Sequence, residues 1–253
     1  MNLVFGLHFP EISHILVWPD FGPGGFNKIA LIGILAALLT AGVFIISGRY
    51  NPTVAPTGLR NVVESSVGFI QNGVIMQTMG PEGLGWTSFL TSLFYFIFFC
   101  NMTEVIPLFQ MPATARMALP AGLAIITWLL FIGTGLKHQG IGYFKSALFP
   151  PGVPKALYVL VTPIELLSTF IVRPFSLAVR LFANMLAGHI LLVTFAVLAA
   201  ALWVQDWYAV FLPLPVLMLI FLMGFEILVS FLQAYIFTIL AAVYIGGAMH
   251  PEH

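Results

Sequence analysis

Five long segments of this chain carry almost no charged residues, and each is long enough to cross a lipid bilayer as a helix. About 20 apolar residues are needed to span the hydrocarbon layer. In the whole chain 60% of residues are hydrophobic and only 7% are charged, whereas a soluble domain carries about 25% charged residues. The sequence therefore predicts an all-α integral membrane protein with five spanning helices, at residues 29–48, 86–105, 117–136, 157–202 and 208–247.

The last two of these segments are much longer than a perpendicular crossing requires. At about 1.5 Å per residue, a helix over either segment would be roughly twice as long as the hydrocarbon layer is thick. We therefore expect both helices to be strongly tilted, kinked or broken. Pro163 and Pro174 lie within the first segment, and Pro213 and Pro215 lie near the start of the second. Because proline removes a helical hydrogen bond, these are expected positions of bends or helix starts.

A sixth helix is expected between the first two spans, at residues 57–79. This segment combines an apolar face with Arg60, Glu64 and Gln71. It is too polar to span a membrane and too apolar to lie free in water. Such an amphipathic pattern is typical of a helix that lies in the membrane interface.

The positions of lysine and arginine predict the orientation of the chain, because these residues accumulate in short cytoplasmic connections. Arg49 and Arg60 follow the first span, and Lys137, Lys145 and Lys155 follow the third. Arg116, which would lie on the outer side, is the one exception. With five spans and one interfacial helix, both groups lie on the cytoplasmic side. The N-terminal segment 1–28 is then outside and the C-terminus inside. Because the N-terminal residues lack the pattern of a cleaved signal peptide, we expect the first span to direct insertion.

Charge balance and cysteine content argue against several other classes of protein. Nine Lys and Arg residues offset nine Asp and Glu residues, so no basic field exists that would attract nucleic acid. The single cysteine, Cys100, allows neither a disulfide framework nor a cysteine metal site, and neither a metal nor a cofactor is expected. The sequence has no convincing internal repeat, which disfavours an inverted-repeat transporter. Residues 1–253 are expected to form one membrane domain, in which residues 157–247 form a pair of long helices.

An arginine lies deep within the fourth apolar segment. At the centre of a membrane helix an arginine costs about 2.5–3.5 kcal/mol on insertion scales, so such a residue usually has a function. Arg173, Ser176, Arg180 and Asn184 are spaced by three, four and four residues, which places them on one helical face. The sequence thus predicts a polar stripe on an otherwise apolar helix.

The fifth segment repeats this design. Its stripe consists of residues that fall on one face at 3.6 residues per turn, namely Glu226, Ser230, Gln233, Phe237 and Tyr244.

His189 lies nine residues beyond Arg180 and therefore points away from the arginine stripe. Glu226 is its best candidate partner, and a buried His–Glu pair can transfer protons near neutral pH. The alternatives are a structural ion pair between Arg180 and Glu226, and interhelical hydrogen bonding by Asn184 and Gln233.

The runs RPFSLAVRLFANMLAGH and FEILVSFLQAYIFTILAAVY closely resemble the two long C-terminal helices of subunit a of rotary ATP synthases. A weaker similarity extends to CNMTEVIPLF. The resemblance implies that Arg180 is the essential stator arginine of the family and that polar residues lining its path include Asn184, Gln233 and Tyr244. His189 and Glu226 occupy two positions that in many bacterial members carry the same two residue types in reverse order, and Glu165 is a further candidate for the outer proton path.

The resemblance also implies a function and a set of partners. The chain would be a noncatalytic, proton-conducting stator subunit in which two aqueous half-channels, separated by Arg180, serve the carboxyl groups of a rotating ring of c subunits. Further partners would be the peripheral-stalk b subunits, other ATP synthase membrane subunits and the lipid bilayer. The expected location is a bacterial plasma membrane, with the mitochondrial inner membrane as the alternative.

Two rival functions are compatible with intramembrane charges. The first is a secondary transporter with a substrate site near the bilayer midplane, formed by arginine and glutamate. The second is a structural or assembly protein whose ion pairs only hold helices together. In the second case, replacement of Arg180 by lysine would leave proton flux intact.

Overall fold

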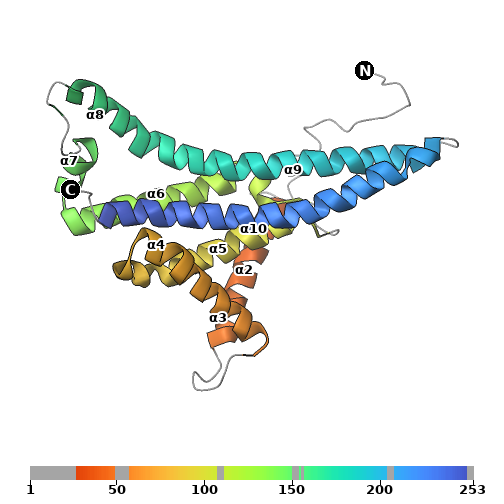
Figure 1. Ribbon diagram of the computed structural model, residues 1–253, viewed down its shortest axis with the longest axis horizontal. Coiled ribbons are helices and arrows are strands. Elements are labelled where there is room, and N and C mark those ends of the chain that lie inside the picture. Colours follow the sequence, from red (N-terminus) through yellow and green to blue (C-terminus); the bar gives the residue numbers. More distant parts are fainter. Residues whose placement is uncertain are drawn as a thin grey trace.

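The computed structural model describes residues 27–48, 57–106, 111–149, 154, 157–203 and 208–249, and within these ranges every regular element is a helix (Figure 1). Five helices are long and apolar enough to cross a membrane, which confirms the five predicted spans to within a few residues. They are Lys28–Gly48, Pro81–Met102, Ala118–Gln139, Tyr158–Trp203 and Ala209–Met249. Nearly all of the predicted outer segment 1–28 lies outside the described residues.

The first span, α2 (Lys28–Gly48), begins with an asparagine cap. The side-chain oxygen of Asn27 accepts hydrogen bonds from the backbone N–H groups of Ile29 and Ala30, each at 3.1 Å. These are donors that the first turn of a helix would otherwise leave unpaired.

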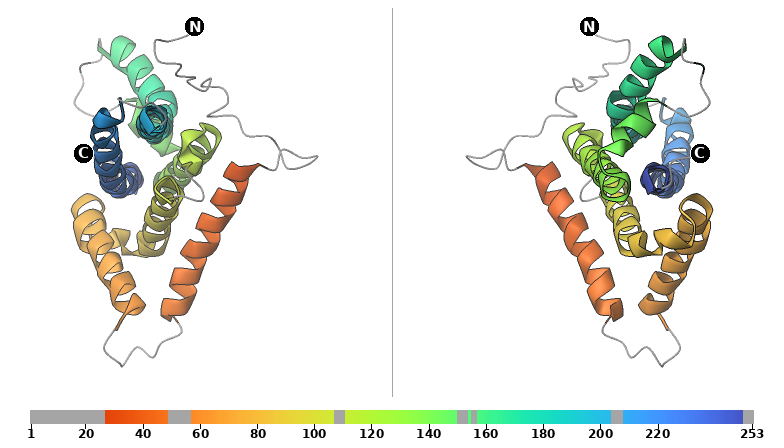
Figure 2. Two further views of the ribbon diagram at one scale, coloured as in Figure 1. Left: turned by 90° about the vertical axis from the view of Figure 1, so that its right-hand side faces the viewer. Right: turned by 90° about the vertical axis from the view of Figure 1, so that its left-hand side faces the viewer.

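The segment predicted as an interfacial helix is helical. Gly58, with φ 60°, precedes α3 (Leu59–Ile70), and this left-handed conformation favours glycine. The helix continues through the π-helical η1 (Gln71–Ile75) into α4 (Met76–Thr78), and it is not among the five helices that could cross a membrane. In Figure 2, α2 and α3 form a V, and both helices also pack against α5 (Thr87–Met102).

The core lies where four helices pack together: α5 (Thr87–Met102), α6 (Ala118–Gln139), α9 (Arg173–Trp203) and α10 (Pro213–Met249). The 3-10 helix η2 (Pro81–Trp86) precedes α5, and η3 (Ala113–Ala115) precedes α6. The largest fully buried side chains of this core include Leu90, Ile97, Phe131, Leu181, Phe237 and Ile245. Buried threonines donate to the carbonyl four residues earlier, as in Thr91 and Thr238, both at 2.8 Å. Their hydroxyl groups therefore remain satisfied in an apolar surrounding.

A short helix, α7 (Gly142–Leu148), packs against the end of α6. The ring of Tyr143 lies so close to Gly135 that a Cβ there would overlap it. Burial raises the pKa of the Tyr143 hydroxyl above its usual value, and the positive charge of Arg173 partly opposes this shift. Tyr143 thus joins α7 to the packing of the membrane helices.

The fourth span is bent, as its length and prolines predict. It consists of α8 (Tyr158–Leu167), the π-helical η5 (Ser168–Val172) and α9, which has Pro174 in its first turn. Proline cannot donate the usual helical hydrogen bond, and a π-helical turn is a common site of a bend. Figure 1 shows α8 turning away from the line of α9 at this point.

The fifth span begins at the prolines that the sequence indicated. The 3-10 helix η6 (Tyr208–Phe211) precedes α10, whose first and third residues are Pro213 and Pro215. Proline is tolerated in the first turn because the N–H groups there lack helical partners in any case. Helix α10 runs back antiparallel beside α9, so that the two form a long hairpin (Figure 1).

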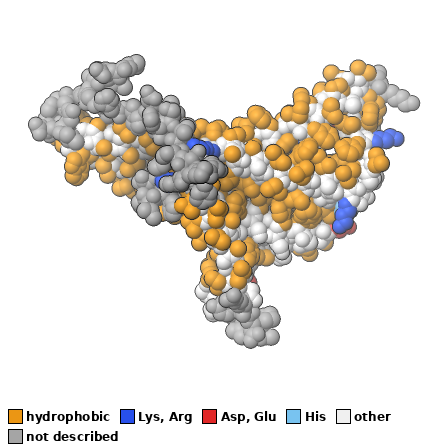
Figure 3. All heavy atoms as spheres, turned by 180° about the vertical axis from the view of Figure 1, so that it is seen from behind, with side chains coloured by type: hydrophobic (Ala, Val, Ile, Leu, Met, Phe, Trp, Pro, Cys, Tyr) orange, Lys and Arg blue, Asp and Glu red, His pale blue; other side chains and the backbone are white. Residues whose placement is uncertain are grey.

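The surface agrees with a bilayer environment. Hydrophobic side chains dominate the face in Figure 3, and lysine and arginine appear there only in isolated places. Large apolar side chains are exposed along α2, α8 and α10, for example Leu38 at 64%, Leu160 at 65% and Leu217 at 69%. A soluble chain rarely exposes contiguous apolar patches of this extent.

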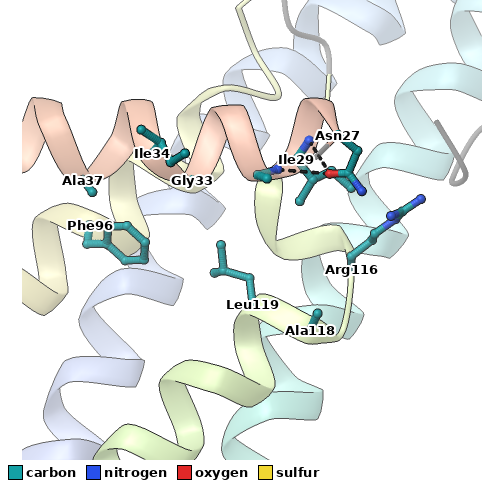
Figure 4. A pocket seen from close by; sticks show the side chains of 10 residues that line it. Asn27, Ile29, Gly33, Ile34, Ala37, Phe96, Arg116, Ala118 and Leu119 are labelled. Atoms are coloured by element: carbon teal, nitrogen blue, oxygen red, sulfur yellow. Dashed lines mark hydrogen bonds between the residues drawn. The ribbon is translucent and has the colours of Figure 1, made fainter. Parts of the chain in front are cut away.

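A groove of about 550 Å³ lies between α2 and the start of α6, with Arg116 and Asn27 at one end and apolar residues along the rest (Figure 4). None of the residues that the sequence singled out as candidate site residues lines this groove. The candidate site is therefore elsewhere, between α9 and α10.

Candidate functional site

The polar stripe of α9 reaches the outer surface of the helix hairpin. Ser176 and Arg180 are half-buried, and Asn184 is exposed together with Ala183 and Ala187. Within the described residues, Arg180 makes no ion pair. A structural ion pair between Arg180 and Glu226, which the sequence had left open, is therefore not formed in this fold.

The facing stripe of α10 is buried. Glu226, Ser230, Gln233 and Phe237 are all 4% exposed or less. The side-chain nitrogen of Asn184 donates to the side-chain oxygen of Gln233 at 2.8 Å. This bond joins the two predicted stripes directly, and it fixes the orientation of both amide groups next to Arg180.

At the far end of the same two helices, Arg173 contacts Tyr244. The guanidinium carbon lies 5.5 Å from the centroid of the tyrosine ring, a distance at which a cation is attracted by the face of an aromatic ring. The antiparallel register set by this contact and by Asn184–Gln233 brings Arg180 level with Phe237. Arg180 therefore lies between the Arg173–Tyr244 contact and the Asn184–Gln233 hydrogen bond.

A buried cluster of one imidazole and two carboxyl groups lies beyond Asn184, toward the C-terminal end of α9. His189 is 5% exposed, and its Nδ1 lies 3.6 Å from Oε1 of Glu104. This is within ion-pair range but too long for a hydrogen bond. Burial raises the pKa of the Glu104 carboxyl above its usual value, and the neighbouring His189 opposes that shift.

The second acid of the cluster, Glu226, fits against the backbone of α9. Its carboxyl group occupies the space beside Gly188, where a Cβ would overlap it. Glu226 is also close enough to Glu104 for their charges to interact. Glu226, the predicted partner of His189, thus packs beside Gly188, and the acid that forms the ion pair with His189 is Glu104.

Glu104 was not identified as a site residue from the sequence. It lies in the turn after α5, 85 residues before His189 in the chain, so no helical spacing relates the two. One signal was an acidic residue at the end of an apolar segment, which is also an ordinary place for a charge at a membrane boundary. The other was its place in the run CNMTEVIPLF, which weakly resembles the family.

Several buried polar atoms of this cluster have no hydrogen-bond partner within the described chain. They are both carboxyl oxygens of Glu104, Oε2 of Glu226, the side-chain nitrogen of Asn101 and the hydroxyl of Ser230. Buried polar groups are normally satisfied by protein or by water. The carboxyl oxygens of Glu104 and Glu226 among them can therefore accept a hydrogen bond or a proton.

Glu165 lies apart from this cluster. It is half-buried on α8, and η5 separates it from Arg180. Along the bent helix it is on the opposite side of Arg180 from His189.

Comparison with known proteins identifies the family. The family model for the ATP synthase A chain matches residues 30–246. Proteins named ATP synthase subunit a from Frankia alni and Parafrankia sp. are 43% and 41% identical to this chain, over 96% and 95% of its length and 86% and 83% of theirs. A third, from Granulibacter bethesdensis, is 36% identical over 92% of this chain and 91% of its own length. The chain belongs to the ATP synthase subunit a family.

Proposed function

We propose that this chain is the proton-conducting stator subunit of a rotary ATP synthase and is itself noncatalytic. The observation that carries the proposal is the placement of Arg180. It is half-buried in an apolar helix, forms no ion pair within the described residues, and lies between two separate groups of polar side chains. Its partner is then a carboxyl group on another subunit.

Arg180 acts as an electrostatic gate. Its guanidinium stays protonated and so cannot relay a proton, but it stabilises an approaching carboxylate in the ionised form. The small, exposed side chains of Ala183 and Ala187 beside it allow a helix of the c-subunit ring to come close. Lysine is a poor replacement, because a buried ammonium group loses its proton far more readily.

Protons travel through two half-channels that meet this ring on opposite sides of Arg180. On the outer side, His189 and Glu226 transfer protons, while Asn184 and Gln233 hold water and orient the site. On the inner side we place Ser176, Tyr244 and Glu165, because they follow Arg180 toward the other end of the helix pair. No proton then passes directly from one half-channel to the other.

The chain is a multi-pass protein of a bacterial plasma membrane, in keeping with its five apolar helices and its bacterial relatives. We place the N-terminus outside and the C-terminus inside, on the basis of the basic residues in the connections. The peripheral-stalk b subunits hold it against rotation. Each proton that crosses about 100 mV releases about 2.3 kcal/mol, which drives the ring past Arg180.

The test is proton pumping by the whole ATP synthase in membrane vesicles. Arg180→Ala and Arg180→Lys should abolish ATP-driven acidification, and Arg180→Ala should also let protons leak passively, since the barrier between the half-channels is lost. Lys137→Ala, which removes an exposed charge at the end of α6, is the control and should pump normally. Coupled pumping by Arg180→Ala would refute the proposal.

A further inference from the structure

We propose that the groove between α2 and the start of α6 binds an anionic phospholipid, with the phosphate at Arg116 and an acyl chain along the apolar walls. The inference goes beyond proton conduction, and none of the residues that line this groove belongs to the site between α9 and α10. It also gives a role to Arg116, the basic residue whose position does not follow the rule that places lysine and arginine on the cytoplasmic side.

The polar end of the groove is suited to a phosphate group. Arg116 follows η3 and lies at the end of the groove that Asn27 also lines (Figure 4). A guanidinium group binds phosphate oxygens through paired, charge-assisted hydrogen bonds. The side-chain oxygen of Asn27 caps α2, and its side-chain nitrogen is a further donor. Among the described residues that line the groove none is acidic, so the charge at this end is complementary to an anion.

The rest of the groove matches an acyl chain that extends through one leaflet. Three helices supply its apolar walls, with Ile34 from α2, Phe96 from α5 and Leu119 from α6. Along α2 the lining runs from Asn27 to Ala37, which at about 1.5 Å per residue is about 15 Å. That length is half of the hydrocarbon thickness of about 30 Å. The volume of about 550 Å³ is within the usual range for ligand pockets.

The groove also lies at the right depth and is open to lipid. Helices α2 and α6 both cross the membrane, and both begin at the polar end of the groove, near Asn27 and Ala118 (Figure 4). That end is therefore at the membrane boundary, where headgroups lie, and the apolar part extends into the hydrocarbon layer. With the orientation proposed above, this is the outer leaflet. Ile34 in the groove wall is 48% exposed, so a lipid can enter from the side.

A glycine in the wall of the groove allows the space itself to be tested. A Cβ added to Gly33 would lie 3.4 Å from the side chain of Leu119, so a larger side chain at position 33 would take the place of the acyl chain. Gly42 lies nine residues further along α2 and therefore on the opposite helical face. No atom lies within 4 Å of a Cβ built on Gly42, which makes it the matched control position.

The experiment uses the whole ATP synthase in phosphatidylcholine vesicles that contain increasing amounts of phosphatidylglycerol with a photoactivatable acyl chain. After illumination, mass spectrometry locates the labelled peptides. We expect label on α2 at residues 29–37, and less label from a phosphatidylcholine probe with the same chain. Arg116→Gln should need about fivefold more phosphatidylglycerol for half-maximal labelling, since one basic residue contributes about this factor. Lys137→Gln, which removes an exposed cation at the other end of α6, is the control and should label as the parent does.

The two glycine positions cover the case in which Arg116→Gln does not assemble. Gly33→Leu should lose the label on α2, and Gly42→Leu should keep it. Equal labelling by the two lipid probes, or unchanged labelling of Gly33→Leu, would overturn the inference. So would the absence of label at these residues in the parent enzyme, as expected if a helix of another subunit fills the groove. None of these results depends on proton flux, so they are distinct from the outcome of the Arg180 variants.

Discussion

Replacing Gly188 by alanine tests whether the position of the Glu226 carboxyl matters for proton transfer. A Cβ at this position would overlap the carboxyl group of Glu226, so the acid must move away from α9. Alanine is a better helix former than glycine by about 0.5–1 kcal/mol, so α9 itself should not be weakened. The substitution therefore acts on the site rather than on the helix.

The size of the effect follows from the cost of overpacking. Forcing a methyl group into a filled site costs about 1–3 kcal/mol, and each 1.4 kcal/mol changes an equilibrium about tenfold. The population of Glu226 in its native position should therefore fall about 5- to 150-fold. ATP-driven proton pumping in vesicles, normalised to the amount of assembled enzyme, should fall by a comparable factor.

Helix α10 supplies a matched control. Gly224 lies two residues from Glu226, and no atom lies within 4 Å of a Cβ built on it. Gly224→Ala should pump normally, and a shorter acid in the double variant Gly188→Ala, Glu226→Asp should restore part of the lost activity. If Gly188→Ala pumps as well as Gly224→Ala, the placement of Glu226 beside Gly188 has no role in proton transfer.

Two further predictions concern stability. A 2.8 Å hydrogen bond joins Asn184 and Gln233, and we expect a coupling energy of about 0.6–2 kcal/mol between them. A double-mutant cycle of Asn184→Ala and Gln233→Ala, followed by thermal unfolding in detergent, measures this energy. Additive effects of the two substitutions would mean that the bond contributes nothing to stability. Burial raises the pKa of Tyr143, so its stabilising contribution is present below the unfolded value of about 10 and is lost as pH rises through the folded value. The melting temperature should thus drop more steeply above about pH 10 in the parent than in Tyr143→Phe, and equal slopes would contradict this.

The sequence predicted the helices and their faces well because these depend on local pattern. Length and hydropathy located five spans, and the prolines at 213 and 215 marked the start of α10. The spacing of polar residues placed Asn184 and Gln233 on faces that do meet. The ion pair of His189 with Glu104 could not be predicted, because it depends on how α5 packs against α9 and no periodicity links distant segments. The π-helical turn before Arg173 could not be predicted either, because a proline indicates that a helix bends but not which kind of turn forms the bend.

The absence of an ion pair for Arg180 within the described residues bears on the assembly of the enzyme. A free copy of this subunit carries an uncompensated cation among lipid chains, at a cost of about 2.5–3.5 kcal/mol. Docking of a partner that presents a carboxylate removes this cost. The residue that we propose as the proton gate thus also makes the solitary subunit unfavourable, and it favours assembly with a partner that supplies a carboxylate.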